Sequence, residues 1–371
     1  MSDHILPAAS NKYISRFRSI LSGSLSNLTM ASPTTLPAPH FLTKFYSLTP
    51  PEQRALLLQK FYALSQLEGE RLRRATDSAD PFSLCVGLTR SIQNRNRYMN
   101  VIPFDRNRIA LRATALAAPD STTHPDYINA SLIDPAILGL SSRKYIVTQG
   151  PLDFPPNPTV GDFWLMAWEQ HSPVIVCLTR VEVGCARYWP AGMDEDVKEW
   201  ETSVGGVRMR VRLVSTPSVH QDADCEIRKL WVEPVDSALG KGREIIHLAC
   251  FGWPDHGVPE NAKHVLSLIR LMHELEAECT GKVGGIAEPG PTIVHCSAGC
   301  GRTGIFCTID NVWRLLEKRA TAVENDDGRD LVYEVVDMLR QQRKTMVEAP
   351  HQYEFCYRAL GSLVGLERSG K

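Results

Sequence analysis

Residues 291–304 read PTIVHCSAGCGRTG and are followed at 305–318 by IFCTIDNVWRLLEK. A short apolar run ends at Cys296, and a glycine-rich stretch comes directly after it. Apolar residues at positions 305, 309, 312 and 316 then recur with the period of a helix. The pattern predicts a strand, a tight turn and the N-terminus of a helix, in that order.

A turn of this kind binds anions, because consecutive backbone N–H groups converge on one point and the helix dipole adds partial positive charge. Cys296 begins the turn, so the same field stabilises its thiolate. Helix N-termini and nearby cations lower a cysteine pKa from about 8.5 to roughly 3.5–7.5. We therefore expect Cys296 to be an ionised nucleophile that attacks a phosphate. The turn residues expected to bind that phosphate are Ser297, Ala298, Gly299, Cys300 and Gly301.

Three neighbouring side chains complete the chemistry expected of this turn. Arg302 carries a planar guanidinium group that matches two phosphoryl oxygens. The hydroxyl of Thr303 is expected to stabilise the thiolate as it leaves. His295 is expected to orient the turn through hydrogen bonds.

Other kinds of site fit the same segment less well. A nucleotide-binding P-loop requires G-x-x-x-x-G-K-[ST], but the stretch GCGRTG that starts at Gly299 contains no lysine. A metal site built from His295, Cys296 and Cys300 would lack a fourth ligand nearby. A purely structural turn around a buried thiol leaves the spacing of cysteine and arginine unexplained. We therefore expect an enzyme that uses neither a metal nor a cofactor.

The heptapeptide WPDHGVP at 253–259 offers a second catalytic group. A phosphocysteine mechanism needs an acid to protonate the leaving group, and Asp255 lies in a loop bounded by prolines and a glycine. The adjacent Trp253 would anchor a lid that carries the acid over the substrate and excludes water. The stretch YWPA at 188–191 has the Trp-Pro pair without an acid. Alone, the heptapeptide would read as a solvated turn; beside a phosphate site, it predicts a general acid.

The composition excludes several classes of function. The 371 residues include 41 Lys and Arg against 42 Asp and Glu, so no basic surplus supports binding of nucleic acid or of a membrane surface. No apolar run reaches the roughly 20 residues of a membrane span, and no signal peptide is visible. None of the ten cysteines forms a C-x-x-C pair, which argues against zinc ribbons and thioredoxin-type sites. We expect reduced thiols in a cytoplasmic protein, with access to the nucleus left open.

The chain divides into a tail and one domain. Residues 1–40 contain one acidic residue and many Ser, Thr, Ala and Pro, so we expect a disordered tail. Residues 41–371 are expected to form a single catalytic domain with N-terminal helices within 41–90, one of them starting at a capping box in TPPE (49–52). Beyond residue 91, β-rich runs at 144–150, 173–180, 207–214 and 243–251 alternate with helical patterns at 162–170, 262–278, 304–318 and 331–343. This alternation predicts an α/β layered fold.

The phosphate turn and WPDHGVP together are similar to motifs of the classical protein-tyrosine phosphatases of the non-receptor type. Five further segments are similar to segments of that family, in the family's order: NRYMNVIPFD (96–105), DYINASLI (126–133), YIVTQGPL (145–152), DFWLMAWEQ (162–170) and RYWP (187–190). The resemblance covers about residues 95–357. It implies a highly twisted mixed β-sheet flanked by helices, in a domain that acts on phosphotyrosine-containing proteins in signalling.

Carried over residue by residue, the resemblance implies the catalytic roles. Cys296 is the nucleophile that forms a thiophosphate, and Arg302 clamps the phosphate. Asp255 acts first as the general acid and then as the base toward water. Trp253 resembles the hinge of the lid that carries this acid.

The resemblance also implies the substrate contacts and shows two departures from the family pattern. Tyr98 forms the aromatic wall of a slot too deep for phosphoserine, and Asn100 contacts the substrate backbone. Gln352 positions the water that hydrolyses the intermediate, but Glu348 replaces the family's first glutamine. A carboxylate beside a phosphocysteine dianion is expected to repel it and to slow hydrolysis. The loop at 181–185 is shorter than the family's and lacks its lysine, so we expect the lid to be held differently.

The sequence leaves two alternatives to a phosphotyrosine-specific phosphatase. One is a phosphotyrosine-binding or trapping module with little turnover, which the replacement at Glu348 favours. The other is a dual-specificity phosphatase that also accepts phosphoserine and phosphothreonine. We expect a monomer, and we expect Cys300 to be a buried bystander, with a reversible disulfide between Cys296 and Cys300 as the alternative.

Overall fold

A computed structural model describes nine segments of the chain. They comprise residues 36–112, 124–140, 143–154, 158–181, 184–193, 197–254, 257–281, 289–322 and 326–366. Residues 1–35 of the predicted tail lie outside the described residues, so the disorder of that tail stays a prediction. The described residues belong, apart from Leu36, to one compact unit, Pro37–Lys371.

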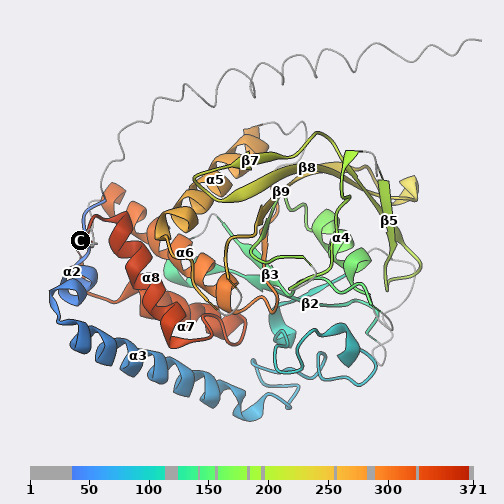
Figure 1. The fold of residues 1–371 in the computed structure, drawn as a ribbon. Helices are drawn as coiled ribbons and strands as arrows, with labels where there is room; N and C mark the ends of the chain where they lie inside the picture. The colour runs from blue at the N-terminus through green and yellow to red at the C-terminus, as the bar shows by residue number, and fades with distance from the viewer. Residues whose placement is uncertain are drawn as a thin grey trace, which may run out of the picture. The chain divides into compact units, whose positions relative to one another are not determined.

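Within the described residues, ten strands form one mixed sheet (Figure 1). Their bounds are β1 (Arg108–Ala110), β2 (Tyr127–Ile133), β3 (Tyr145–Thr148), β4 (Val174–Cys177), β5 (Val197–Glu201), β6 (Arg208–Leu213), β7 (Ser218–His220), β8 (Cys225–Pro234), β9 (Arg243–Cys250) and β10 (Thr292–His295). The order across the sheet is β1-β2-β3-β10-β4-β9-β8-β6-β5, with β7 paired to β8. β10 runs parallel to β3 and β4, and β4 runs parallel to β9, whereas the other pairs are antiparallel. The predicted mixed sheet is confirmed.

The central parallel strands lie in the interior of the domain. Every residue of β3, β4 and β10 is buried, as expected for parallel strands covered on both faces. Ile175 and Ile293 belong to an apolar cluster that includes residues of helix α4 (Val160–Glu169). Val294 points to the opposite face, because successive side chains of a strand alternate. The predicted phosphate turn therefore follows a rigid, fully buried strand, β10.

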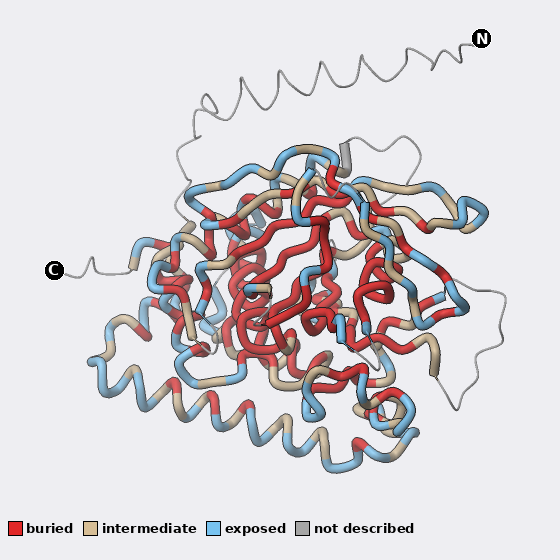
Figure 2. Tube along the Cα trace, turned by 45° about the vertical axis from the view of Figure 1, so that its right-hand side comes forward, coloured by how far each residue is buried: buried red, intermediate tan, exposed pale blue. Residues whose placement is uncertain are grey.

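Seven α-helices of the described residues flank the sheet. Besides α4 they are α2 (His40–Ser47), α3 (Pro50–Arg71), α5 (Ala262–Gly281), α6 (Gly301–Ala322), α7 (Leu331–Gln342) and α8 (Pro350–Leu363). α4 packs against β5, β6 and β8, whereas α5 contacts β4 and α6 contacts β10 (Figure 1). Figure 2 shows buried stretches of the trace gathered in the interior of the domain, and the first sixteen residues of α6 are all buried. Among the described residues, no helix is both long and apolar enough to cross a membrane.

Local signals predicted the strands β3, β4, β6, β9 and β10 and all the helices except α8, whereas β1, β2, β5, β7 and β8 were not predicted as strands. The capping box is present, since the backbone N–H of Thr49 donates to the carboxylate of Glu52 over 2.8 Å. α6 begins at Gly301 rather than at residue 304, because the N–H of Gly304 already donates to the carbonyl of Cys300 over 2.8 Å. The phosphate turn thus runs straight into the first helical turn. Strand β8 was not predicted, because charged residues interrupt its apolar positions.

Candidate active site

The turn between β10 and α6 has the backbone shape predicted for an anion site. Gly299 has a φ of +70°, and a Cβ there would lie 2.2 Å from the carbonyl oxygen of Thr148. A Cβ at Gly304 would lie 2.2 Å from the backbone nitrogen of Val347. Both positions require glycine, because the atoms that a side chain would meet belong to the backbone. The turn is therefore held between the end of β3 and the segment that precedes α8.

A pocket of about 70 Å³ opens at this turn. Its lining includes the predicted nucleophile Cys296, the predicted phosphate clamp Arg302 and the predicted water-positioning residue Gln352. The other lining residues are Tyr98, Asn100, Val101, Ser297, Ala298, Gly301 and Glu348. The structure therefore brings most of the predicted site residues together. Of the predicted turn residues, Gly299 and Cys300 do not line the pocket.

The thiol of Cys296 is buried, yet its pKa lies below the ordinary value for a cysteine. Burial alone would raise this pKa, but three influences together outweigh it: the charge of Arg302, the hydroxyl of Thr303, and the backbone N–H groups of Thr303 and Cys300. The backbone N–H of Gly299 also donates to the sulfur over 3.3 Å. A lowered pKa means a larger thiolate fraction at neutral pH, as the predicted nucleophile requires.

These influences predict how alkylation of Cys296 should depend on pH. The thiolate is the form that attacks iodoacetamide and displaces iodide, so the rate constant should stay high below the ordinary cysteine pKa and fall only as pH drops through the lowered value. Arg302→Ala removes the main charge that lowers this pKa, and should move the midpoint to higher pH. Mass spectrometry of the Cys296 peptide, from about pH 4 to about pH 9, measures the midpoint. An unchanged midpoint in Arg302→Ala would contradict the electrostatic explanation.

The same experiment carries an internal control. Burial raises the pKa of Cys300 to about 12, and its thiol donates to the carbonyl oxygen of Lys344 over 3.4 Å. Cys300 should therefore stay unlabelled over the whole pH range. Cys296 and Cys300 are both free thiols, and the reversible disulfide that is the alternative to a bystander role for Cys300 stays a prediction.

A chain of hydrogen bonds holds the carbonyl group of Cys296. The Nδ1–H of His295 donates to that carbonyl oxygen over 3.1 Å. Nε2 of His295 lies 2.6 Å from the hydroxyl of Tyr188, which also lies 2.7 Å from Nε2 of His247. All three side chains are fully buried. These hydrogen bonds support the orienting role predicted for His295. They also extend it to Tyr188 and His247, which no sequence pattern had marked as site residues.

Tyr98 stands at the mouth of the pocket. Its side chain is 39% exposed, and its hydroxyl lies 2.8 Å from the hydroxyl of Ser297 in the turn. The neighbouring Arg97 fixes this segment, because its backbone N–H donates to Gln149 over 2.8 Å and its guanidinium group donates to the carbonyl of Pro151 over 2.9 Å. The position of Tyr98, the predicted aromatic wall, is therefore set by the loop that follows β3.

Arg343, which the sequence analysis did not single out, holds the turn from the end of α7. The side chain is fully buried and donates to the carbonyl oxygens of Gly299 and Ala298, each over 2.9 Å. It also donates to the side-chain oxygen of Asn129 over 2.9 Å. No local pattern marks this residue, because its partner Gly299 lies 44 positions away in the chain. Arg343 acts as a positioning residue for the phosphate turn.

Arg343→Met should lower kcat/KM by about 10²-fold, because a misplacement of reacting groups by about 1 Å has that effect. The matched control is Arg340→Met, since Arg340 is similarly buried on the same helix but donates to the carbonyls of Met346 and Val347. Thermal unfolding should show similar losses of Tm in the two variants. Steady-state kinetics should show a smaller loss of kcat/KM in Arg340→Met than in Arg343→Met. Equal losses of activity in the two variants would reduce Arg343 to a structural role.

The loop that carries the predicted acid is described only at its two ends. Asp255 and His256 lie outside the described residues, so the position of the acid stays a prediction. Trp253 is buried, its ring centroid lies 6.3 Å from that of Phe355, and its indole N–H donates to the carbonyl of Gly257 over 3.2 Å. That hydrogen bond joins the two sides of the loop, which supports the predicted hinge at Trp253.

The short loop at 181–185 is connected to the acid loop through its neighbour Arg180. The Nε–H of Arg180 donates to the carbonyl oxygen of Phe251 over 2.8 Å, two residues before Trp253. Glu182 and Val183 lie outside the described residues. This contact gives the lid an arginine at its base, in a loop that lacks the lysine expected from the resemblance.

Glu348 and Gln352 meet at the N-terminus of α6. The side-chain oxygen of Gln352 accepts a hydrogen bond from the backbone N–H of Glu348 over 2.8 Å. A Cβ at Gly301 would lie 2.8 Å from Nε2 of Gln352 and 3.1 Å from a carboxylate oxygen of Glu348. The carboxylate therefore lies beside the positive end of the helix, where it opposes the binding of another anion. Among the described residues, no three His, Cys, Asp or Glu side chains are grouped so that they could hold a metal ion.

Comparisons with known proteins agree with this geometry. A sequence model of the family described as protein-tyrosine phosphatase matches residues 92–362. The chain is 33% identical over 285 residues to tyrosine-protein phosphatase non-receptor type 9 of Mus musculus, which covers 74% of this chain and 42% of that protein. It is 38% identical over 274 residues to receptor-type tyrosine-protein phosphatase C of Mus musculus, which covers 72% of this chain and 18% of that protein. The chain thus spans less than half the length of these relatives.

Proposed function

The chain belongs to the protein-tyrosine phosphatase family, and on that basis we propose that it hydrolyses phosphotyrosine in proteins through a thiophosphate on Cys296. The observation that carries the proposal is the lowered pKa of Cys296 in a pocket that Arg302 and Tyr98 also line. A thiolate, a guanidinium group and an aromatic wall in one pocket suit attack on an aryl phosphate dianion.

The proposed reaction has two steps. The phosphate binds the N–H groups of the turn and the guanidinium group of Arg302. The thiolate of Cys296 attacks phosphorus, a P–S bond forms, and the P–O bond breaks as Asp255 protonates the leaving phenolate. In the second step Gln352 positions a water whose oxygen attacks phosphorus, and Asp255, now a carboxylate, accepts its proton as the new P–O bond forms. The P–S bond then breaks, the hydroxyl of Thr303 stabilises the departing thiolate, and inorganic phosphate is released.

The test of substrate class compares three peptides that differ only in phosphotyrosine, phosphoserine or phosphothreonine. We propose that the ring of Tyr98 stacks on the substrate ring and that Asn100 contacts the peptide backbone. Short alkyl phosphates would not reach Cys296 past this wall, so kcat/KM should favour phosphotyrosine by at least about 10²-fold. The assay is run near pH 6 with a chelator. Comparable rates for all three peptides would favour the dual-specificity alternative instead.

A trapping module with little turnover is the second candidate, and the position of Glu348 beside the helix N-terminus is the observation that favours it. Repulsion between this carboxylate and the phosphocysteine dianion should make dephosphorylation limiting, with a rapid burst of product before a slow steady state. Glu348→Gln should raise the steady-state rate several-fold and shrink the burst. Stopped-flow kinetics with p-nitrophenyl phosphate measures both phases. Glu354→Gln, an exposed carboxylate of α8, is the matched control. No change in Glu348→Gln would show that the carboxylate does not limit turnover.

We also propose a monomeric, cytoplasmic enzyme with access to the nucleus left open. The ten cysteines are all free thiols, which suits a reducing compartment. The near-neutral formal charge of −1 supports phosphoproteins rather than nucleic acids as partners. Light scattering of the purified chain tests whether it is a monomer. Imaging of a tagged chain tests whether it is cytoplasmic.

A further inference from the structure

Two cysteines outside the catalytic pocket face each other across strands β8 and β9. Cys225, the first residue of β8, is the direct register partner of Cys250, the last residue of β9. Both are buried, with 3% and 5% exposure, and both are free thiols in contact with each other. The proposed reaction at Cys296 uses neither of them.

The register of this pair fits a disulfide. Directly opposite residues of an antiparallel pair have Cα atoms about 4.5–5.5 Å apart. A disulfide needs a Cα separation of about 4.4–6.8 Å, so the whole range of such pairs satisfies it. Cys225 and Cys250 can therefore be joined by small local shifts, without a change of strand register.

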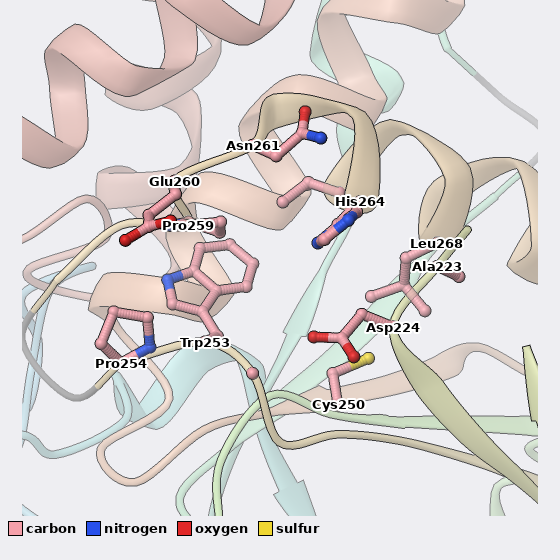
Figure 3. Close-up of a pocket in the computed structure, with 12 residues that line it drawn as sticks. Ala223, Asp224, Cys250, Trp253, Pro254, Pro259, Glu260, Asn261, His264 and Leu268 are labelled. Atoms are coloured by element: carbon pink, nitrogen blue, oxygen red, sulfur yellow. The ribbon is translucent and has the colours of Figure 1, made fainter. Parts of the chain in front are cut away.

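A cavity gives small solutes access to Cys250, one member of the pair. Cys250 lines a cavity of about 350 Å³, together with Asp224, Trp253 and His264. Figure 3 shows the sulfur of Cys250 beside the carboxylate of Asp224, with the indole of Trp253 and the imidazole of His264 at other parts of the wall. This cavity and the catalytic pocket share no lining residue. A small hydroperoxide can therefore reach Cys250 without passing through the catalytic pocket.

The pair lies at the base of the loop that carries the predicted acid. Two residues separate Cys250 from Trp253, and both ends of the acid loop line the same cavity. A Cβ at Gly252 would lie 1.9 Å from a carboxylate oxygen of Asp224, so the turn that precedes Cys225 packs directly on the start of the loop. Because Asp224 and Gly252 pack closely and lie next to Cys225 and near Cys250 in the chain, we expect a movement of Cys250 toward Cys225 to shift the start of the loop.

We propose that Cys225 and Cys250 form a reversible oxidation site, at which a hydroperoxide creates a disulfide that slows turnover; the effect on turnover rests on the proposed phosphatase function. In the first step the sulfur of Cys250 attacks the peroxide, the O–O bond breaks, water or an alcohol leaves, and Cys250 becomes a sulfenic acid. In the second step the sulfur of Cys225 attacks that sulfur, an S–S bond forms, and water leaves. The two thiols lose two electrons and two protons, which the hydroperoxide accepts. A dithiol reductant reverses the reaction.

Burial makes this site slower to react than the catalytic cysteine. Burial raises the pKa of Cys250 well above its ordinary value, and Cys225, Cys177 and Asp224 act in the same direction. The thiolate of Cys250 is therefore scarce at neutral pH, whereas the pKa of Cys296 is lowered. Oxidation of the pair should speed up as pH rises, and it responds to sustained rather than brief exposure to oxidant.

The first test maps the cross-link in the full chain carrying Cys296→Ser, which removes the most reactive thiol. The protein is treated with hydrogen peroxide at about pH 8.5, the ordinary pKa of a cysteine, and quenched with catalase and N-ethylmaleimide. Mass spectrometry of the unreduced digest should show the Cys225 and Cys250 peptides joined, and dithiothreitol should separate them. Absence of this pair, or disulfides between other cysteines in its place, overturns the proposal. The map requires no turnover, so its failure is distinct from a failure of the proposed function.

The second test measures the effect on the acid loop. The unsubstituted chain is oxidised in saturating inorganic phosphate, which shields Cys296, and is then desalted and compared with Cys225→Ala treated identically. The control keeps Cys250 but cannot form the bond. Only the unsubstituted chain should lose kcat, by about threefold or more, with an unchanged KM and recovery in dithiothreitol. Hydrogen exchange at residues 251–259 should change only in that chain. Equal kcat and equal exchange in the two oxidised proteins overturn the proposal.

Discussion

Cys296→Ser is expected to abolish hydrolysis of phosphotyrosine peptides while leaving their binding intact. A serine hydroxyl is not ionised at neutral pH, so the charge of Arg302, which lowers the pKa of Cys296, has no thiolate to stabilise. Oxygen in place of sulfur changes the volume of the buried side chain little, so the turn should still bind a phosphate dianion. The rate should fall by several orders of magnitude.

A turnover assay with chelator, combined with calorimetric titration of a phosphotyrosine peptide, measures both halves of this expectation. Cys300→Ser is the matched control, because Cys300 lies in the same turn but its thiol donates to the carbonyl of Lys344 over 3.4 Å. The control should keep most of its activity. Substantial turnover by Cys296→Ser would exclude the thiophosphate mechanism, and an equal loss in Cys300→Ser would trace the effect to disturbance of the turn.

Asp255→Ala is expected to lower kcat by about 10²–10⁴-fold and to change KM far less. The acid acts as the P–O bond breaks. Its removal therefore raises the free energy of the transition state without weakening substrate binding. The loss should be larger for a phosphotyrosine peptide than for p-nitrophenyl phosphate, because nitrophenolate leaves without a proton. The alkaline limb of the pH profile of kcat, which reports the protonated acid, should disappear.

Steady-state kinetics on both substrates across the pH range measures these effects. Glu260→Gln is the matched control, because Glu260 is an exposed carboxylate at the far end of the same loop and lines the 350 Å³ cavity rather than the catalytic pocket. Its kcat should be unchanged. Equal effects of Asp255→Ala on kcat and KM, or equal losses with both substrates, would contradict the role of Asp255 as general acid.

The phosphate turn was predictable because its determinants are local. Cys296, Arg302 and the glycines between them lie in one stretch of 14 residues, 291–304. The glycines allow a backbone conformation that other residues rarely adopt. Gly299 has such a conformation, with a positive φ of +70°. The helix dipole then follows from the apolar period of the next segment. Motif and structure agree here because residues within this stretch set the backbone shape of the turn, although distant groups such as Arg343 hold it in place.

Strand β8 and Arg343 were not predictable in the same way. In β8 (Cys225–Pro234) charged residues such as Glu226 and Lys229 stand among the apolar ones, because the strand buries only part of its surface. An arginine is usually exposed, so nothing in the sequence around Arg343 indicates that it is fully buried against the turn. Its position depends on how α7 packs.

By itself, the sequence determined which groups can carry the proposed chemistry: a cysteine and an arginine on a glycine-rich turn, and an aspartate in a loop between prolines. Only the tertiary structure decided what surrounds them, namely the support from Arg343, the contact between the hydroxyls of Tyr98 and Ser297, and the pairing of Cys225 with Cys250. The physical reason is the range of the interactions. Glycine conformation and a helix dipole act between chain neighbours, whereas strand register and buried hydrogen bonds join residues that meet only when the sheet and helices pack.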